Sequence, residues 1–211
     1  MLFRSKIDHQ NLHITGIGGQ HMHDAGVHLV DNLARFGVTG ISEVIRNIRV
    51  LRQVFINIKN HLKTSKPDLL ILVDCPGFNL PLAKFAKRTL GIQILYYISP
   101  QIWAWKAGRI KRIKECVDQM AVIFPFEKKL YEKAGVPVAF VGHPLVEKVK
   151  PCSDVKFSRE QLGLPQGKRL IALLPGSRAH EIERHMPVMR DTAQTLSKQH
   201  NDIHFVIPVA G

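Results

Sequence analysis

Residues 67–79 read PDLLILVDCPGFN, and this stretch decides the fold that the sequence predicts. An unbroken apolar run from Leu69 to Val73 ends in Asp74, and a Pro–Gly pair follows one residue later. A continuous run of this kind is typical of a parallel strand covered on both faces, and the Pro–Gly pair indicates a turn. In an open parallel sheet the carboxyl ends of the strands border the ligand crevice. The sequence therefore predicts a buried strand whose end presents Asp74 to a crevice.

Short runs rich in Leu or β-branched residues recur along the chain and alternate with amphipathic segments. We expect strands at residues 12–17, 69–74, 92–98, 119–124, 138–141, 169–174 and 204–208. Helical periodicity lies between them at residues 42–62, 80–90, 107–116, 127–134 and 181–198. This alternation of strands and helices predicts a doubly wound, Rossmann-like α/β fold with a parallel sheet.

A change of composition divides the chain. Residues 148–167 are polar and contain two prolines, so we expect a linker with a short helix there. The expected organisation is a first domain at 1–150, a linker at 151–167 and the start of a second domain at 168–211. Because no helical pattern follows the last expected strand, the second domain is expected to be truncated.

The chain is strongly basic. Its 30 Lys and Arg residues outnumber 17 Asp and Glu residues, which gives a formal net charge of +13, and 11 His residues add to this below neutral pH. Such a surface favours anionic partners, namely phosphorylated substrates, acidic lipid headgroups or nucleic acid. The hydrophobic share of 45% and the charged share of 22% exclude intrinsic disorder and a collagen-like or coiled-coil fibre.

Cysteine usage and the N-terminus indicate the compartment. Cys75, Cys116 and Cys152 form no C-x-x-C pair, so a reducing environment is expected. The opening residues, MLFRSKIDHQ, lack the apolar region of a signal peptide. No apolar run approaches the ~20 residues of a spanning helix. We expect a soluble or peripheral protein.

Two roles fit Asp74 equally well. A carboxylate at the end of a parallel strand can act as a general base and accept a proton from an attacking hydroxyl. The same carboxylate can instead cap the following turn or helix. Its position in the sequence favours neither role.

A second candidate site lies in residues 173–183, LLPGSRAHEIE, where an expected strand, a glycine turn and a helix follow one another. Gly176 permits a tight turn, Ser177 offers a hydroxyl, and the first N–H groups of the helix can bind an anion. Arg178 adds a forked cation suited to phosphate oxygens. Glu181 fits a structural role in a capping box equally well. The stretch favours a phosphate site, although it is not a Walker A loop, because no G-K-[ST] follows.

Two weaker patterns come early in the chain. The GIGG sequence at 16–19 lacks the G-x-G-x-x-G spacing, so a tight turn is favoured and no nicotinamide cofactor is expected. His21, His23 and His28 lie close together without an acidic or Cys partner, so no metal site is expected.

An apolar stripe of helical spacing runs through residues 41–62 and begins with Ile41, Val44, Ile48 and Leu51. Arg and Lys residues fall largely elsewhere around this helix, and a basic amphipathic helix can lie on an anionic membrane. These four residues are the candidates for membrane or acyl-chain contact. Packing into the core explains the stripe as well and is the favoured alternative.

Residues 99–112 place Trp103 and Trp105 among several cations. Aromatic side chains in such a setting can stack on nucleic-acid bases or sit at a lipid interface. They can also pack a loop onto the domain while the cations stay in water. The sequence does not choose among these roles.

Six stretches, taken together and in order, resemble one known family. They are GIGGQHM (16–22), FGVTGISEVI (36–45), PDLLILVDCPGFN (67–79), YYISPQIWAWKAGRIKRI (96–113), FPFEKKLYEKAGVPVAFVGHPLVE (124–147) and LLPGSRAHEI (173–182). In these stretches the chain resembles the lipid-A-disaccharide synthases, bacterial glycosyltransferases of the lipopolysaccharide pathway.

The resemblance implies a GT-B architecture of two Rossmann-like domains and an inverting, metal-independent transfer without a cofactor. The implied donor is UDP-2,3-diacylglucosamine and the implied acceptor is 2,3-diacylglucosamine 1-phosphate. The implied products are the β-1,6-linked lipid A disaccharide and UDP. Asp74 matches the general base for the acceptor 6-hydroxyl, and Arg178 matches the arginine that holds donor phosphate, with Ser177 and Gly176 beside it. The resemblance also implies a cytoplasmic enzyme, bound peripherally to the inner membrane of a Gram-negative bacterium.

Compared with this family, the chain is expected to be a fragment. It is expected to lack a first strand with a glycine-rich loop, and the C-terminal half that supplies most of the nucleotide-sugar site. The chain alone is therefore expected to be inactive. Two alternatives are a non-catalytic remnant and a basic nucleic-acid-binding module. The second lacks any RNP, helix-turn-helix or zinc-finger signature, so no nucleic acid partner is expected.

Overall fold

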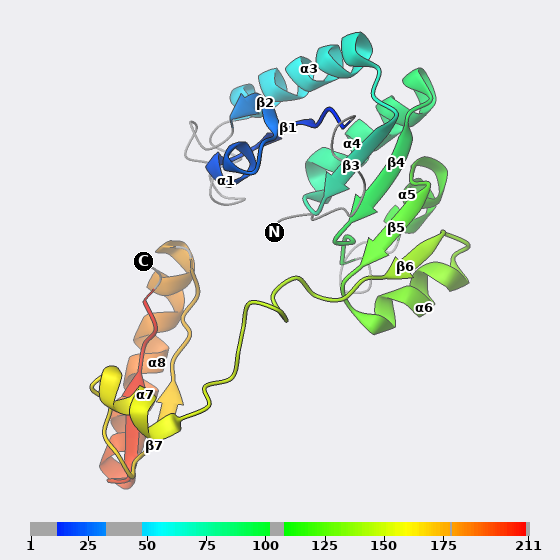
Figure 1. Cartoon of the computed structure of the whole chain (residues 1–211). Coiled ribbons are helices and arrows are strands. Elements are labelled where there is room, and N and C mark those ends of the chain that lie inside the picture. Colours follow the sequence, from blue (N-terminus) through cyan, green and yellow to red (C-terminus); the bar gives the residue numbers. More distant parts are fainter. Residues whose placement is uncertain (1–11, 33–47, 102–107, 178, 210–211) are drawn as a thin grey trace. The chain divides into compact units, whose positions relative to one another are not determined.

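The computed structural model describes residues 12–32, 48–101, 108–177 and 179–209, and the chain divides into two compact units (Figure 1). The first unit is Met1–Val149 and the second is Lys150–Gly211. Each unit combines helices with strands that pair in parallel. The predicted α/β class with parallel sheets is therefore confirmed.

The described residues of the first unit form two parallel sheets. β1 pairs with β2, and β3, β4, β5 and β6 form a four-stranded sheet in that order. In chain order the elements are β1 (Thr15–Gly18), α1 (Gln20–Asp24), β2 (His28–Asn32), α3 (Ile48–Ser65), β3 (Leu69–Val73), α4 (Pro76–Phe85), the π-helix η3 (Ala86–Leu90), β4 (Gln93–Tyr97), α5 (Arg109–Cys116), β5 (Gln119–Val122), α6 (Pro125–Lys133) and β6 (Val138–Phe140).

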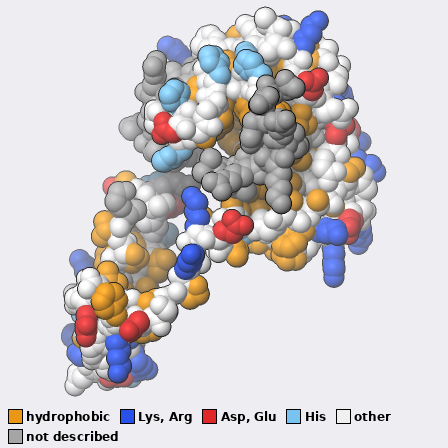
Figure 2. Space-filling model, viewed as in Figure 1, with side chains coloured by type: hydrophobic (Ala, Val, Ile, Leu, Met, Phe, Trp, Pro, Cys, Tyr) orange, Lys and Arg blue, Asp and Glu red, His pale blue; other side chains and the backbone are white. Residues whose placement is uncertain are grey.

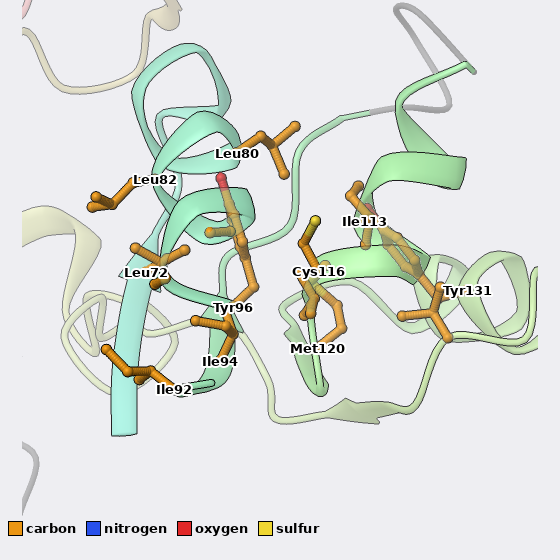
Figure 3. Packing of buried hydrophobic residues seen from close by; sticks show 14 of the residues in the cluster. Leu72, Leu80, Leu82, Ile92, Ile94, Tyr96, Ile113, Cys116, Met120 and Tyr131 are labelled. Atoms are coloured by element: carbon orange, nitrogen blue, oxygen red, sulfur yellow. The ribbon is translucent and has the colours of Figure 1, made fainter. Parts of the chain in front are cut away.

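The main core lies on one face of the four-stranded sheet (Figure 3). Side chains alternate between the two faces of a strand, so Ile94 and Tyr96 of β4 point to the same side and are both fully buried. Helices α3, α4, α5 and α6 all contribute to this cluster. Its helical members include Ile58, Leu62, Leu80, Ala83, Ile113, Cys116 and Tyr131.

The opposite face of β3 is open. Leu69, Ile71 and Val73 are 46–48% exposed, whereas Leu72 between them is buried. The prediction that this strand is covered on both faces is therefore wrong. The physical reason is that α3 to α6 place their apolar side chains in the cluster on the Leu72 side.

The second unit contains α7 (Val155–Gln161), β7 (Arg169–Ala172), α8 (Ala179–Gln199) and β8 (Ile203–Val206). β7 and β8 pair in parallel. α7 lies in the stretch for which a linker with a short helix was expected, and the Asp154 carboxylate caps it by accepting from the Phe157 N–H at 3.0 Å. Among the helices of the described part of the chain, none has the length and apolar character needed to cross a membrane.

The helix after β3 starts earlier than predicted. α4 begins at Pro76 rather than at residue 80, because proline suits the first position of a helix, where no N–H partner is needed. β2 and α1 have no counterpart among the predicted elements. β2 contains only two adjacent apolar residues, Leu29 and Val30, which is too little for a strand pattern.

Candidate active site

Asp74 directly follows β3 at the carboxyl end of the strand. Its N–H donates to the Tyr97 carbonyl on β4 at 3.0 Å, so the hydrogen-bonded ladder reaches this residue. The chain then leaves the sheet through two residues in the left-handed region, Asp74 at φ 47° and Cys75 at φ 43°. Residues other than glycine adopt this conformation at a cost of about 1–3 kcal/mol each, so surrounding contacts must hold it.

Two buried side chains from different elements bind the backbone of this turn. Asn79 on α4 donates through Nδ2 to the carbonyls of Val73 at 3.0 Å and Asp74 at 2.7 Å. The Tyr96 hydroxyl on β4 donates to the same Asp74 carbonyl at 2.5 Å. Burial raises the pKa of Tyr96 far above its usual range, and the charge of Asp74 raises it further. The Tyr96 hydroxyl therefore keeps its proton and remains a donor.

The Asp74 carboxylate itself is exposed and has no hydrogen bond or ion pair to any residue in the described ranges. Cys75 is the N-cap residue of α4, and no side chain forms a cap hydrogen bond there. The structure thus does not show the alternative in which Asp74 caps the turn or the helix. A free carboxylate at this edge is available to accept a proton from a bound hydroxyl.

Strained backbone is concentrated at this edge of the sheet. Of the four described residues other than glycine with positive φ, Asp74 and Cys75 are the first two after β3, and Ile98 is the first after β4. Ile98 has φ 60°, which is a true outlier for a β-branched residue. Strained residues cluster at active sites and ligand clamps, so this edge is the candidate active site.

A buried carboxylate organises the loop that follows β4. Glu127 is 1% exposed and accepts from the Ser99 hydroxyl at 2.7 Å and from the Phe124 N–H at 3.2 Å. Tyr131, also on α6, donates to the Pro100 carbonyl at 3.2 Å. These bonds tie the start of the loop after β4 to α6. The candidate active site therefore borders a loop whose first residues are fixed by buried polar contacts.

The second candidate site, around Gly176, lies in the second unit. Gly176 has φ 121°, and a Cβ there would lie 2.6 Å from the Glu181 Oε2, so only glycine fits. The Ser177 N–H donates to the same Glu181 oxygen at 3.1 Å, which gives Glu181 a structural role at the start of α8. The Ser177 hydroxyl is exposed and has no partner within the described part of the chain. Arg178 lies outside the described residues.

Much of the candidate membrane stripe also lies outside the described residues. Ile41 and Val44 are not described, and neither is the side chain of Ile48, which begins α3. Leu51 is half-buried. The continuation of the stripe packs into the core as the favoured alternative expects, through Val54, Ile58 and Leu62. Trp103 and Trp105 are outside the described residues as well.

The other early patterns show no site. The GIGG sequence forms the end of β1 and the turn into α1. In the described ranges, no three side chains of His, Cys, Asp or Glu gather closely enough to hold a metal ion. His21 and His23 lie on α1 and His28 begins β2.

Known proteins match nearly the whole chain. The sequence model described as lipid-A-disaccharide synthetase matches residues 2–211. The chain belongs to the lipid-A-disaccharide synthetase family. A relative named lipid-A-disaccharide synthase 1, from Legionella pneumophila (strain Lens), is 57% identical over 206 residues, which cover 98% of this chain and 54% of the relative. The predicted resemblance is confirmed.

Two further members of the lipid-A-disaccharide synthetase family agree with this. The lipid-A-disaccharide synthase of Geobacter sulfurreducens is 46% identical over 195 residues, or 92% of this chain and 50% of the relative. The lipid-A-disaccharide synthase of Coxiella burnetii (strain Dugway 5J108-111) is 44% identical over 200 residues, which cover 95% of this chain and 53% of the relative. The chain thus spans about half the length of these relatives. Its parallel α/β units agree with the Rossmann-like GT-B fold expected of a lipid-A-disaccharide synthetase.

Asp74 and the Gly176 turn stand out in the sequence as candidates, whereas the residues that contact the backbone of Asp74 do not. Asn79 is contained in the stretch 67–79, yet no spacing rule assigns it to the backbone of Asp74. Tyr96 reaches that carbonyl from the neighbouring strand. Glu127 carries one detectable signal, because Glu at the third position of a helix is typical of a capping box.

Proposed function

We propose that this chain is part of a lipid-A-disaccharide synthase, a glycosyltransferase. In this proposal the first domain, at 1–150, binds the acceptor 2,3-diacylglucosamine 1-phosphate. The second, beginning at 168 after the linker at 151–167, takes part in binding UDP-2,3-diacylglucosamine. The family membership and the free Asp74 carboxylate at the carboxyl edge of the sheet support the proposal.

Asp74 acts as the general base in this reaction. Its carboxylate takes the proton of the acceptor 6-hydroxyl as that oxygen attacks the anomeric carbon of the donor. A new carbon–oxygen bond forms on one face of the sugar, and the bond to the UDP oxygen breaks on the other. This displacement inverts the anomeric centre, gives the β-1,6 linkage and releases UDP. The observation that carries the role is the exposed carboxylate without a described partner.

The turn at 176–178 contacts donor phosphate in this proposal. Gly176 keeps the turn tight, and the Ser177 hydroxyl is exposed and available. Arg178 supplies a fixed positive charge that suits phosphate oxygens. The chain's formal charge of +13 suits phosphorylated substrates at an anionic membrane surface, where we place the enzyme on the cytoplasmic side of the inner membrane. On the face shown in Figure 2, Lys and Arg side chains lie on both units.

The test uses a full-length protein in which this segment replaces the matching residues of the Legionella pneumophila relative. Both lipid substrates are supplied and the disaccharide is measured by chromatography of a labelled acceptor. We expect the unmodified protein to form product and Asp74→Asn to lose ~10²–10⁴-fold in turnover, the usual contribution of a general base. Near-normal turnover in Asp74→Asn would exclude Asp74 from this role.

A further inference from the structure

The carbonyl of Asp74 accepts two hydrogen bonds at once. One comes from the Tyr96 hydroxyl on β4 and the other from Asn79 Nδ2 on α4. A carbonyl oxygen has two lone pairs, so both are used, and the peptide between Asp74 and Cys75 is fixed in orientation. Asn79 also binds the preceding carbonyl, that of Val73, so the turn is held on both sides of Asp74.

Tyr96 connects this turn to the rigid interior. Its side chain is fully buried and stands among Leu72, Leu80 and Ile94 in the main core (Figure 3). Side chains in a close-packed core have little freedom to move, so the core sets the position of the Tyr96 hydroxyl. Asn79 is also buried, at 8% exposure, and lies on the first turn of α4.

The hydrogen bonds of Asn79 Nδ2 and of the Tyr96 hydroxyl to this turn go to its backbone carbonyls and not to the Asp74 carboxylate. The backbone conformation decides in which direction the Cα–Cβ bond of Asp74 leaves the chain. We propose that Tyr96 and Asn79 are positioning residues, which hold the Asp74–Cys75 turn in its left-handed conformation and thereby aim the Asp74 carboxylate at the acceptor hydroxyl. This inference rests on the proposed role of Asp74 as the general base.

A merely structural role for Tyr96 would consist of filling the core and satisfying a carbonyl. Tyr131 provides the matched control for that role, because it is also buried in the main core and its hydroxyl also donates to a backbone carbonyl, that of Pro100. Tyr96→Phe and Tyr131→Phe each remove one hydroxyl and keep the ring. Asn79→Ala removes the other donor to the turn.

The chain carries its own reporters of local conformation. Cys75 is exposed within the turn, Cys152 is exposed in the second unit, and Cys116 is buried in the main core. The rate at which iodoacetamide labels each thiol is measured by mass spectrometry on the 211-residue chain. Cys75 then reports the turn, Cys152 is the internal reference, and Cys116 reports opening of the core.

We expect Tyr96→Phe and Asn79→Ala to change the labelling rate of Cys75 several-fold while Cys116 and Cys152 keep their rates. Tyr131→Phe is expected to leave the Cys75 rate unchanged. An unchanged Cys75 rate in both turn variants would overturn the inference. So would a rise at Cys116 in step with Cys75, because the residues would then support the core as a whole.

Kinetics of the full-length protein described above test the effect on the reaction. A turn that no longer aims Asp74 should lower kcat by roughly 10- to 100-fold and leave the KM for the acceptor nearly unchanged. Asp74→Asn combined with Tyr96→Phe should be no slower than Asp74→Asn alone, because Tyr96 acts through Asp74. A further loss in the double variant would contradict the inference.

Failure of the inference and failure of the proposed function give different results. If Asp74 is not the base, Asp74→Asn keeps its turnover, whereas the labelling of Cys75 still responds to Tyr96→Phe. If Tyr96 and Asn79 do not position the turn, Asp74→Asn loses turnover and the labelling of Cys75 does not respond.

Discussion

Asp74 combines a left-handed backbone with a carboxylate that has no partner in the described part of the chain. Asp and Asn adopt this conformation more readily than most residues, and β-branched residues adopt it least. Substitutions at this position therefore separate chemistry from folding. The choice of residue decides which of the two is tested.

We expect Asp74→Asn to keep the free energy of unfolding of the protein while it loses turnover. Asp74→Val should lower the free energy of unfolding by about 1–3 kcal/mol, because a β-branched residue is strained at φ 47°. Denaturant unfolding followed by circular dichroism measures both variants. Equal stability of the Asn and Val variants would show that the turn does not enforce its φ value.

Arg178→Ala is expected to weaken the binding of the UDP-sugar in the full-length protein. A charge-assisted contact to phosphate contributes about 1.5–3 kcal/mol, which corresponds to roughly 10- to 150-fold in affinity. Arg184, exposed on α8, is the matched control, and Arg184→Ala should bind as the unmodified protein does. Calorimetric titration with the donor measures the affinity of each variant. Equal affinity in Arg178→Ala and Arg184→Ala would exclude Arg178 from the phosphate site.

At the scale of single residues, the sequence allows some members of the candidate site to be predicted and not others. Asp74 and Gly176 could be picked out as candidates because Asp74 ends one recognisable strand pattern and Gly176 lies in the turn after another. Tyr96 and Asn79 could not, because their partner is the backbone of another segment. Which backbone group they reach depends on strand register and on the left-handed turn, and neither is encoded in local periodicity.

Among the elements, α3 carries one apolar stripe whose burial changes along the length of the helix. Val54, Ile58 and Leu62 are in contact with the core, and Leu51, one turn before them, is only half-buried. The periodicity of the sequence predicted a helix over 42–62, and the described helix runs from Ile48 to Ser65. The periodicity could not show which apolar residues contact the core and which could contact a membrane, because both kinds of contact require the same spacing.

Leu51→Asp is expected to reduce co-sedimentation of the protein with vesicles that contain phosphatidylglycerol. A carboxylate there would be repelled by the anionic surface and would remove apolar contact. Ile56 is also exposed on α3 but lies roughly 140° around the helix, so Ile56→Asp is the matched control. Unfolding of Leu51→Asp would refute membrane contact, since the side chain would then belong to the core.

Strands were predicted better than their surroundings. The four strands of the larger sheet were found because each is a compact apolar run, whereas β2 was missed for lack of one. The prediction that β3 is covered on both faces was wrong for a different reason. An apolar run shows that a strand prefers burial on both faces, but whether a second layer is present depends on the rest of the molecule.

For the whole molecule, buried tyrosines lower the stability at alkaline pH. Burial raises the pKa of Tyr131 from 10.0 to about 12, and the nearby Glu127 carboxylate contributes. Above pH 10 the unfolded chain loses this proton while the folded chain keeps it, so stability falls as the pH rises towards 12. Tyr96, whose pKa is raised by burial as well, adds to the same loss.

We therefore expect the free energy of unfolding to decrease by about 2 kcal/mol or more between pH 10 and pH 12 through these tyrosines. Tyr131→Phe should make this decrease smaller, because phenylalanine has no proton to lose. Urea unfolding across this range, followed by fluorescence, measures the slope. The same slope in Tyr131→Phe and the unmodified protein would show that Tyr131 ionises equally in both states.

The 211-residue chain alone is expected to form no measurable disaccharide. It spans about half the length of its relatives, and transfer requires donor and acceptor to be held in one geometry, a contribution of up to ~7–11 kcal/mol. The assay uses both lipid substrates, with the full-length relative as the positive control. Product from the short chain at a comparable rate would show that the described units suffice for catalysis.

The order of the strands has a consequence for how the chain acquires its structure. Every strand pair in the described residues joins strands that are consecutive among the described strands: β1 with β2, β3 with β4, β4 with β5, β5 with β6, and β7 with β8. Closing a loop between strands that are neighbours in sequence costs less entropy than closing one over the whole chain. Each strand can thus pair as soon as it leaves the ribosome, against a strand that is already present, and the edge that will carry Asp74 can form while later segments are still being synthesised.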